Sequence, residues 1–377
     1  SNERQFCKDY AKFIGTKYCL CLANGTVTLQ CALQAVGVKP GDEVIVPGLT
    51  WVATAQAALD IGANVVLVDI DRETLGIDPA ALEKAITRRT RAIIPVHLYG
   101  CMTDMDAVMR IARKHKLKVV EDVAHQHGSQ WRGKSAGAIG DAGSYSFQQS
   151  KVLTSGEGGA ITCNDPEVYK VCFALKQVGW MPKDPKKSWF DNLGYGNHYG
   201  HNYRITEMQA VLLRGGLSRL KAQTEQREEA AAFIREELAR LGGPLQAARR
   251  DPRITRQAYY GMTFKYDKVA AGGVEKQAYL EALHAEGAPF GGVYAPVYRN
   301  GLLNLYDSTS PVPFRDRKTI QNYRHLKLPN VEYACRDGAV TMTHPVLLGS
   351  RAYLKQIVIA VARVNARLAE IKAGQRK

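Results

Sequence analysis

The stretch Lys118-Val119-Val120-Glu121-Asp122-Val123-Ala124-His125 decides how the fold is read. It opens with a short β-branched run, typical of a strand buried on both faces of a parallel sheet. Similar runs alternate with amphipathic helical patterns in the first half of the chain. The runs are residues 43–47, 64–69, 91–96 and 118–122, and the helical patterns are residues 26–37, 52–62, 79–87 and 104–116. This alternation predicts an α/β fold with a mostly parallel sheet flanked by helices.

The pattern changes in the second half of the chain. A long helical spacing runs from Thr206 to Leu241 and stops at Gly242-Gly243-Pro244, a candidate hinge. An alternating strand at 259–266 and helices at 275–287 and 352–371 follow. We therefore expect a large α/β domain over 1–243 and a smaller α+β domain over 244–377. Segments 180–203 and 288–325 are irregular, which is typical of functional loops or partner contacts.

Composition excludes several classes of protein. The 377 residues are 45% hydrophobic and 23% charged, near the average for globular proteins, and no apolar run is long enough to span a membrane. The net charge of +15 is spread over helix faces rather than gathered into a stripe, so we expect no nucleic-acid partner. The eight cysteines include no CxxC pair and lie mostly in apolar runs. They predict buried thiols, no metal site and, with no signal peptide visible, a cytoplasmic protein.

Chemically capable side chains follow the predicted strands. Asp122 and His125 come after the run at 118–122, and Lys151 comes shortly after Ser144-Tyr145-Ser146-Phe147. In an open parallel sheet, ligands bind at the carboxyl ends of the strands. A lysine and an aspartate placed there suit pyridoxal 5'-phosphate (PLP), which is bound as a Schiff base to a lysine while a carboxylate pairs with its pyridinium nitrogen.

Two further stretches complete such a site. Asn24-Gly25-Thr26 begins a predicted helix, where free backbone N–H groups favour an anion such as a phosphate. Trp51 follows another strand and can stack on an aromatic ring. Each residue alone has a commoner explanation: a surface lysine, a helix cap, a core tryptophan or a buried polar histidine. His125, His127 and Asp122 could also suggest a metal site, but no third ligand pattern accompanies them. The combination favours PLP.

These motifs resemble the DegT/DnrJ/EryC1/StrS family of PLP-dependent aminotransferases, of fold-type I, over nearly the whole chain. The motifs are Asn24-Gly25-Thr26, Pro47 to Thr54, Glu121-Asp122 with His127-Gly128, Ser146-Phe147 before Lys151, Gly156 to Gly159, and Asn202-Tyr203-Arg204. The resemblance implies Lys151 as the Schiff-base lysine and proton shuttle and Asp122 as the partner of the pyridinium. It implies cofactor contacts from Gly25, Thr26, Trp51, His125 and Ser146, and from Asn202 to the cofactor of a second subunit, hence a homodimer.

A narrower resemblance concerns the substrates. Residues 148–154 and 256–261 are similar to the glutamine-dependent aminotransferases of aminocyclitol antibiotic pathways. That similarity implies L-glutamine as amino donor, a cyclic polyhydroxy ketone as acceptor and the pyridoxamine form of the cofactor between the two half-reactions. His344 falls in a His-containing stretch of that subgroup, although Pro345 stands where a second His is usual. Tyr294, Tyr298 and Arg299 lie in a loop of the kind that contacts substrate.

Two other functions stay open on the sequence. The same cofactor supports dehydration or aromatisation of a cyclic ketone, as in the 3-amino-5-hydroxybenzoate synthases, which share the Gly-Glu-Gly-Gly region. A non-catalytic PLP-binding regulator, binding DNA through its positive charge, is the alternative from another class. Loss of donor amine to a chiral amino product distinguishes transfer from both.

Overall fold

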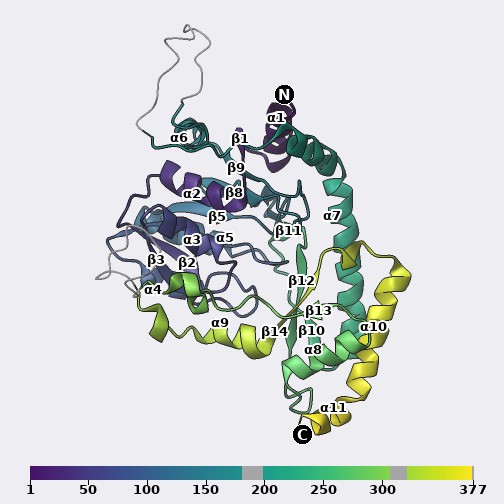
Figure 1. The fold of residues 1–377 in the computed structure, drawn as a ribbon. Coiled ribbons are helices and arrows are strands. Elements are labelled where there is room, and N and C mark those ends of the chain that lie inside the picture. Colours follow the sequence, from purple (N-terminus) through teal and green to yellow (C-terminus); the bar gives the residue numbers. More distant parts are fainter. Residues whose placement is uncertain (181–197, 306–320, 376–377) are drawn as a thin grey trace.

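The central element is a seven-stranded sheet in the order β1-β9-β8-β5-β4-β2-β3 (Figure 1). The computed structural model describes residues 1–180, 198–305 and 321–375. Four of the seven strands correspond to the four runs predicted from the sequence. The strands are β1 (Tyr18–Leu22), β2 (Glu43–Pro47), β3 (Asn64–Val68), β4 (Thr90–Ile93), β5 (Lys118–Asp122), β8 (Ala142–Ser146) and β9 (Gly159–Cys163). The predicted runs therefore form strands within a few residues of their expected bounds.

Pairing directions make this sheet mostly parallel, as predicted. Strands β3, β2, β4, β5 and β8 are parallel neighbours, and β9 is antiparallel to both β8 and β1. Because β1 is antiparallel to β9, it runs in the same direction as β8. The carboxyl ends of β1, β2, β4, β5 and β8 consequently meet at one edge of the sheet, where ligands bind in such folds.

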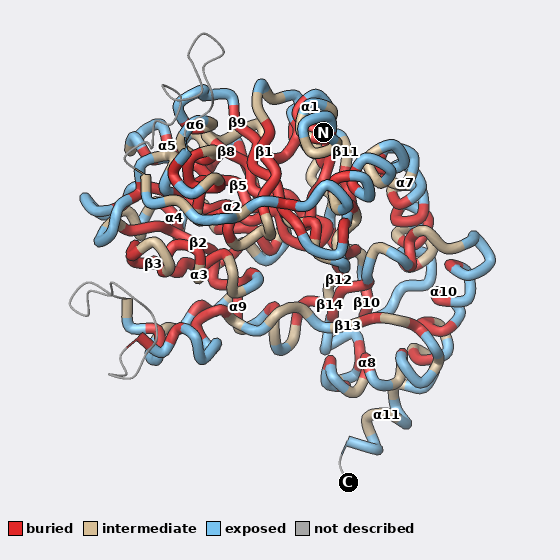
Figure 2. Tube along the Cα trace, turned by 45° about the horizontal axis from the view of Figure 1, so that its top comes forward, coloured by how far each residue is buried: buried red, intermediate tan, exposed pale blue. Residues whose placement is uncertain are grey.

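Helices cover both faces of the sheet. Helices α2 (Gly25–Ala35), α3 (Ala53–Asp60) and α6 (Pro166–Lys176) contribute to one apolar cluster, and α1 (Asn2–Ile14), α4 (Pro79–Ala85) and α5 (Met105–His115) contribute to the other. Strand β1 shows the alternation behind this arrangement, because Leu20 and Leu22 belong to the first cluster while Cys19 and Cys21 belong to the second. The strands form the buried centre of the molecule in Figure 2.

A second sheet, in the order β10-β12-β14-β13, builds the smaller α+β unit. Its elements are β10 (Leu245–Ala247), β12 (Gly261–Tyr266), β13 (Phe290–Gly291), β14 (Ala339–Thr343), α8 (Lys276–Ala285), α10 (Arg351–Ala366) and α11 (Leu368–Gly374). The prediction of one helix over 352–371 is wrong, because the helix breaks at Arg367, whose φ and ψ of −112° and 17° leave the α-helical region. Helix α11 buries no residue and projects from the body (Figure 2).

The long helix α7 (Glu207–Leu241) joins the two units (Figure 1). Its first half packs Leu213 and Leu220 into a core of the large sheet, and its second half packs Phe233 and Ile234 into the core of the small unit. Thr206 caps its start, and its side chain and that of Gln209 form a reciprocal capping box. The helix thus begins and ends where the sequence predicted.

The chain after residue 243 does not stay within the small unit. A region with the short helices η1 (Val297–Arg299), η2 (Gly301–Leu303), η3 (Tyr323–His325), α9 (Pro329–Tyr333) and η4 (Ala334–Gly338) packs on the large core. The predicted domain boundary at residue 243 therefore stays a prediction, because the chain after it contributes both to the small unit and to the core of the large unit. Of the two segments predicted to be irregular, 181–197 and 306–320 lie outside the described residues.

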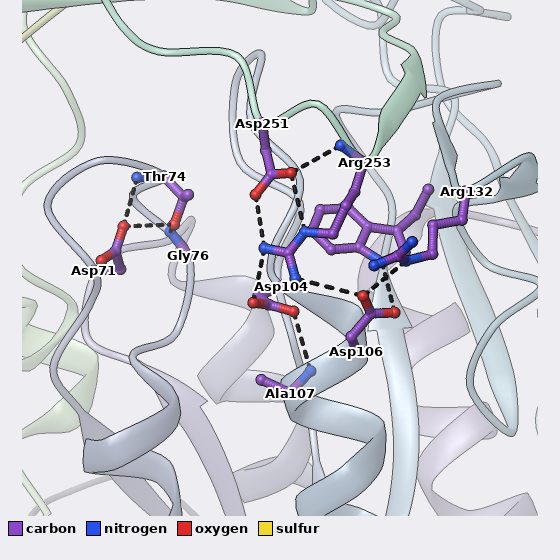
Figure 3. Close-up of polar contacts among 10 residues, drawn as sticks. Asp71, Thr74, Gly76, Asp104, Asp106, Ala107, Arg132, Asp251 and Arg253 are labelled. Carbon is purple, nitrogen blue, oxygen red and sulfur yellow. Dashed lines mark hydrogen bonds and ion pairs between the residues drawn. The ribbon is translucent and has the colours of Figure 1, made fainter.

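Strand β11 (Ile254–Arg256) also returns to the large unit, where it pairs with β6 (Gln130–Trp131), itself paired with β7 (Lys134–Ser135). Arg253 anchors this crossing: its guanidinium contacts Asp251 at 2.7 Å, Asp104 at 2.9 Å and Asp106 at 3.4 Å, and it lies 4.4 Å from the ring centre of Trp131 (Figure 3). The crossing sets the position of the residues that follow β11. No helix among the described residues is long and apolar enough to cross a lipid bilayer.

Candidate active site

One cavity opens at the carboxyl edge of the large sheet. It has a volume of about 330 Å³ and is lined by the loops that follow β1, β2, β4, β5 and β8, together with two tyrosines from the second half of the chain. Seven predicted site residues meet there. They are Gly25, Thr26, Trp51, Asp122, His125, Ser146 and Lys151. Residues up to 126 positions apart in the sequence thus share one pocket because parallel strands end at one edge.

Asp122 is a buried carboxylate at the end of β5. Its Oδ2 accepts a hydrogen bond from the Thr54 hydroxyl at 2.9 Å, and its Oδ1 accepts one from the Ala124 backbone N–H at 3.1 Å. Thr54 in turn contacts the Thr50 hydroxyl at 2.9 Å. Burial raises the pKa of Asp122, although these hydrogen bonds and the charge of Lys151 oppose the shift. A cation placed beside this carboxylate would favour its ionised form.

Lys151 lies in the turn that follows β8. Burial lowers the pKa of its amine to about 8, against a smaller opposing effect of the Asp122 charge. Its Nζ is 4.6 Å from the ring centre of Tyr260, and no ion pair in the described part of the chain involves it. A lysine of lowered pKa that lacks a carboxylate partner is suited to act as a nucleophile or base.

The start of α2 forms a cradle for an anion. Asn24 caps the helix through its side-chain oxygen, which accepts the Val27 N–H at 3.0 Å. The earlier N–H groups of the first turn, beside the cavity, have no partner within the helix and can bind a ligand. A Cβ at Gly25 would come within 2.8 Å of the Cβ of Ser146. Glycine is therefore required where the helix start approaches the end of β8, and the Ser146 hydroxyl is held beside it.

His125 is a neutral imidazole of defined tautomer. Its Nδ1 accepts the backbone N–H of Tyr99 at 3.2 Å, so its proton lies on Nε2, which is 3.4 Å from the Tyr294 hydroxyl. Burial lowers the pKa of His125 well below its usual value, and the charge of Lys151 adds to the shift. His125 therefore presents a hydrogen-bond donor to the pocket and carries no charge.

Trp51 supplies an exposed aromatic face. Its side chain is 58% exposed although it lines the cavity, and its ring centre lies 5.6 Å from that of Tyr294 at an angle of 56°. Large indoles are usually covered in a folded protein. An uncovered tryptophan that lines the cavity is suited to stacking on a planar ligand or to contact with a partner.

Four predicted site residues do not line the cavity: Asn202, Tyr298, Arg299 and His344. Asn202 is exposed and its side chain accepts the Arg204 N–H at 3.5 Å. Tyr298 is buried and donates a hydrogen bond to Glu332 at 3.1 Å, and Arg299 contacts the same carboxylate at 3.5 Å. Neither of the last two lines the pocket, because their short helix packs on the large core.

His344 lies outside the cavity and contacts two segments that line it. Its Nε2 lies 3.0 Å from the carbonyl oxygen of Ser150, the residue before Lys151. Its own backbone N–H donates to the carbonyl of Tyr260 at 3.0 Å. The side chain thus connects the lysine turn with the segment that carries Tyr260, and the predicted direct contact of His344 with substrate stays untested.

Sequence reasoning gave no site role to several residues that line the cavity. Tyr260 stacks on His125 and its hydroxyl lies 3.2 Å from that of Ser150, while Thr54 holds Asp122. Both residues fall inside stretches that carry the family resemblance, which was the available signal. Tyr294 was considered only for substrate, yet its backbone N–H also donates to the Tyr99 hydroxyl at 2.7 Å. Their roles depend on contacts between distant loops.

The chain is similar to several curated proteins along almost its whole length. A protein of Streptoalloteichus tenebrarius with the provisional name L-glutamine:3-amino-2,3-dideoxy-scyllo-inosose aminotransferase is 40% identical over 367 residues, 96% of this chain and 86% of its own. The L-glutamine:2-deoxy-scyllo-inosose aminotransferase of Micromonospora echinospora is 37% identical over 376 residues, 99% of this chain and 88% of its own. Both similarities extend through the large and the small unit.

Solved structures of the same architecture confirm the predicted fold class, fold-type I. The crystal structure of 3-amino-5-hydroxybenzoic acid synthase matches with a TM-score of 0.82 at 31% identity, over 97% of this chain and 91% of that one. An aminotransferase from Psychrobacter cryohalolentis matches with a TM-score of 0.83 at 30% identity, over 98% and 92%. The model of the DegT/DnrJ/EryC1/StrS aminotransferase family matches residues 1–338, and with the cavity described above this places the chain among the enzymes of that family, to which it belongs.

Proposed function

We propose that this aminotransferase uses PLP to move an amino group from L-glutamine to a cyclic polyhydroxy ketone of the scyllo-inosose type. The observation that carries the proposal is the meeting of Lys151 and Asp122 in one cavity beside an anion cradle. The names of the relatives supply the donor and the class of acceptor.

The residues present fit the cofactor. Lys151 offers an amine without a carboxylate partner in the described part of the chain, and Asp122 offers a buried carboxylate that a pyridinium would neutralise. Gly25, Thr26 and Ser146 line the cavity at the start of α2, where backbone N–H groups and the Ser146 hydroxyl can bind a phosphate. Lys151, Asp122, Gly25, Thr26 and Ser146 would hold the group, with Trp51 on the ring and His125 donating from Nε2.

When bound, PLP supplies an electron sink that stabilises negative charge at the carbon next to the transferred nitrogen. The chain does the remaining work. Asp122 would favour a protonated ring nitrogen in the bound group, because an ionised carboxylate in a buried site favours a cationic partner. Lys151 takes a proton from the amino donor through its neutral Nζ and returns one to the acceptor, work that a pKa of about 8 suits at neutral pH. Thr54 holds Asp122 in place.

The proposed homodimer is supported by exposed apolar side chains. They are Tyr199, Met208, Val211 and Leu212, each at least half exposed. Three of them lie on the first turns of α7, close in sequence to Asn202. Covering such residues favours association. We propose that Asn202 reaches the cofactor phosphate of the partner subunit, which agrees with its position outside the cavity of its own chain. A cytoplasmic location and a role in antibiotic formation are further parts of the proposal.

The first experiment measures transfer directly. The purified enzyme is incubated with L-glutamine and 2-deoxy-scyllo-inosose, and both loss of donor amine and formation of amino product are quantified. We expect equal amounts of each, and no turnover by Lys151→Ala. The structural likeness to 3-amino-5-hydroxybenzoic acid synthase gives a second candidate, dehydration with aromatisation. Water loss from a ketone without consumption of glutamine would replace our proposal with that one.

A second experiment tests the shared active site. We expect the Lys151→Ala protein to be inactive and the Asn202→Ala protein to be weakened. The two proteins are mixed and allowed to exchange subunits. If Asn202 acts across the interface, a mixed dimer contains one site with both native residues, so activity returns toward about one quarter of the native value for random exchange. If Asn202 acts within its own chain, every site in the mixture lacks a residue and no activity returns.

A further inference from the structure

A second cluster of reactive side chains lies between α1 and β1. It joins Cys7 of the helix with Cys19 and Cys21 of the strand, and the three sulfur atoms all lie within 4.8 Å of one another. The Sγ atoms of Cys7 and Cys21 are 3.4 Å apart, and all three cysteines are free thiols. Among the described residues, no other group of three or more potential metal ligands is gathered this closely. We call these residues the three-thiol cluster.

The folding of both elements explains the cluster. Residues two apart on a strand point to the same face, so Cys19 and Cys21 both face α1. The helix packs against them through Phe6 and Tyr10, which belong to the same apolar core. Cys7 follows Phe6 directly and comes down beside the two strand thiols. The motif Cys-x-Cys alone predicted no site, since the third sulfur comes from an element 12 residues earlier.

The spacing suits a metal ion rather than a bond between sulfurs. A zinc–sulfur bond is about 2.3 Å long, so three sulfurs around one ion lie about 4 Å apart. That separation falls within the 4.8 Å span of the cluster. The ion would need little movement of the backbone, because α1 and β1 are already packed together. Thiolates also select soft ions over Mg²⁺ and Ca²⁺.

Binding of an ion would release protons from the cluster. All three cysteines are free thiols, and a metal is held by the thiolate form, so the protons would pass to solvent as the ion enters. The buried Lys176 forms an ion pair with Glu3, which offsets its positive charge.

We propose that Cys7, Cys19 and Cys21 form a binding site for a thiophilic metal ion, Zn²⁺ in the first instance, with three sulfur ligands and a fourth position for water. Cys7 is half-buried and gives access from solvent, while the two strand thiols are buried. The site is separate from the active-site cavity, whose lining includes none of the three cysteines. The two sites are close along the chain, since Asn24 follows Cys21 by three residues.

Cd²⁺ is the probe, because its thiolate complexes absorb in the ultraviolet. The full-length, reduced, PLP-loaded enzyme is titrated with CdCl₂, and competition with ZnCl₂ follows. We expect one ion per chain, a charge-transfer band typical of three sulfurs, and displacement by Zn²⁺. Cys7→Ser should weaken binding by at least about tenfold, in line with the loss of metal-site groups generally. Cys335→Ser is the matched control, as Cys335 is also a half-buried free thiol.

Stability provides an independent readout. An ion that binds the folded chain raises its melting temperature, so Zn²⁺ should raise that of the native and Cys335→Ser proteins but not that of Cys7→Ser or Cys21→Ser. The melting temperatures without metal show whether each variant is folded. Absence of the band in the native protein, or equal binding by Cys7→Ser, overturns the proposal. Binding that is lost equally in Cys335→Ser does so as well, because the ion would then lie elsewhere.

Discussion

The imidazole of His125 stacks on the phenol ring of Tyr260, with ring centres 3.8 Å apart and planes inclined by 17°. His125 comes from the loop after β5 of the large sheet, and Tyr260 comes from the residues just before β12 of the small one. The stack therefore joins the two units at the cavity. It also places Tyr260 under the amine of Lys151 and leaves the Nε2 proton of His125 directed toward Tyr294.

Two substitutions at His125 distinguish the effect of its hydrogen-bond donor from the effect of its stacked ring. His125→Gln keeps an N–H donor and loses the stack, whereas His125→Leu loses both. We expect the leucine variant to be about tenfold less active than the glutamine variant, the effect of about 1.4 kcal/mol for one neutral hydrogen bond. Steady-state rates and the cofactor dissociation constant measure the difference. Equal losses in both variants would show that only the ring matters.

The lowered pKa of Lys151 predicts when its amine reacts. In the apoenzyme the amine is protonated below about pH 8 and neutral above it, so the rate of PLP uptake should rise with pH through a midpoint near 8 rather than 10.5. Because the charge of Asp122 opposes the shift, Asp122→Asn should move the midpoint lower still. Rates are followed by absorbance, with Lys151→Ala as the control. A midpoint above pH 10 contradicts the burial of this amine.

The same shift predicts a trend in stability. Between about pH 8 and 10.5 the unfolded chain keeps the Lys151 proton that the folded apoenzyme has lost. The unfolded state then binds more protons, so this group's contribution to the free energy of unfolding rises with pH across that window and is constant below it. Denaturant unfolding of native and Lys151→Met apoenzymes at pH 7 and 10 measures it. The free energy of unfolding of the native apoenzyme should rise relative to that of the Lys151→Met apoenzyme between pH 7 and pH 10.

Gly25→Ala tests the cradle. The added methyl would come within 2.8 Å of the Cβ of Ser146, so we expect a loss of about 1–3 kcal/mol in stability and weaker binding of the cofactor. The control is Gly301→Ala, where no atom lies within 4 Å of the added methyl. The double variant Gly25→Ala, Ser146→Gly removes the clash and should recover stability without recovering cofactor affinity, since the hydroxyl is lost. Thermal unfolding and PLP titration report the two effects.

Arg253 tests the connection between β11 and the large unit. Its side chain is 29% exposed and contacts three carboxylates, so Arg253→Ala should lower the free energy of unfolding by about 1–3 kcal/mol. Arg240, 70% exposed and paired within α7, is the control, and Arg240→Ala should change stability by less than about 0.5 kcal/mol. High salt should weaken the first effect only in part. Similar values for both variants would assign Arg253 no anchoring role.

The large sheet and the core of the candidate site could be predicted from the amino-acid sequence. Alternating buried strands and helices predict a parallel sheet, and parallel strands end at one edge, so Asp122 and Lys151 could be placed together without coordinates. The helix start at Asn24-Gly25-Thr26 and the start of the long helix at Thr206 were also predicted, because the signals for a helix start are local. The break of the C-terminal helix at Arg367 was missed because no Gly or Pro marks it.

Which distant loops meet could not be predicted, because it depends on how the whole chain packs. Tyr260 and Tyr294 reach the cavity because β11 crosses to the large unit and the residues after β13 return to it. The packing of whole elements also places Tyr298 and Arg299 outside the pocket and brings Cys7 beside Cys19 and Cys21. The pattern of apolar side chains predicts which face of a helix or strand is buried. Which other element covers that face depends on contacts across the entire chain.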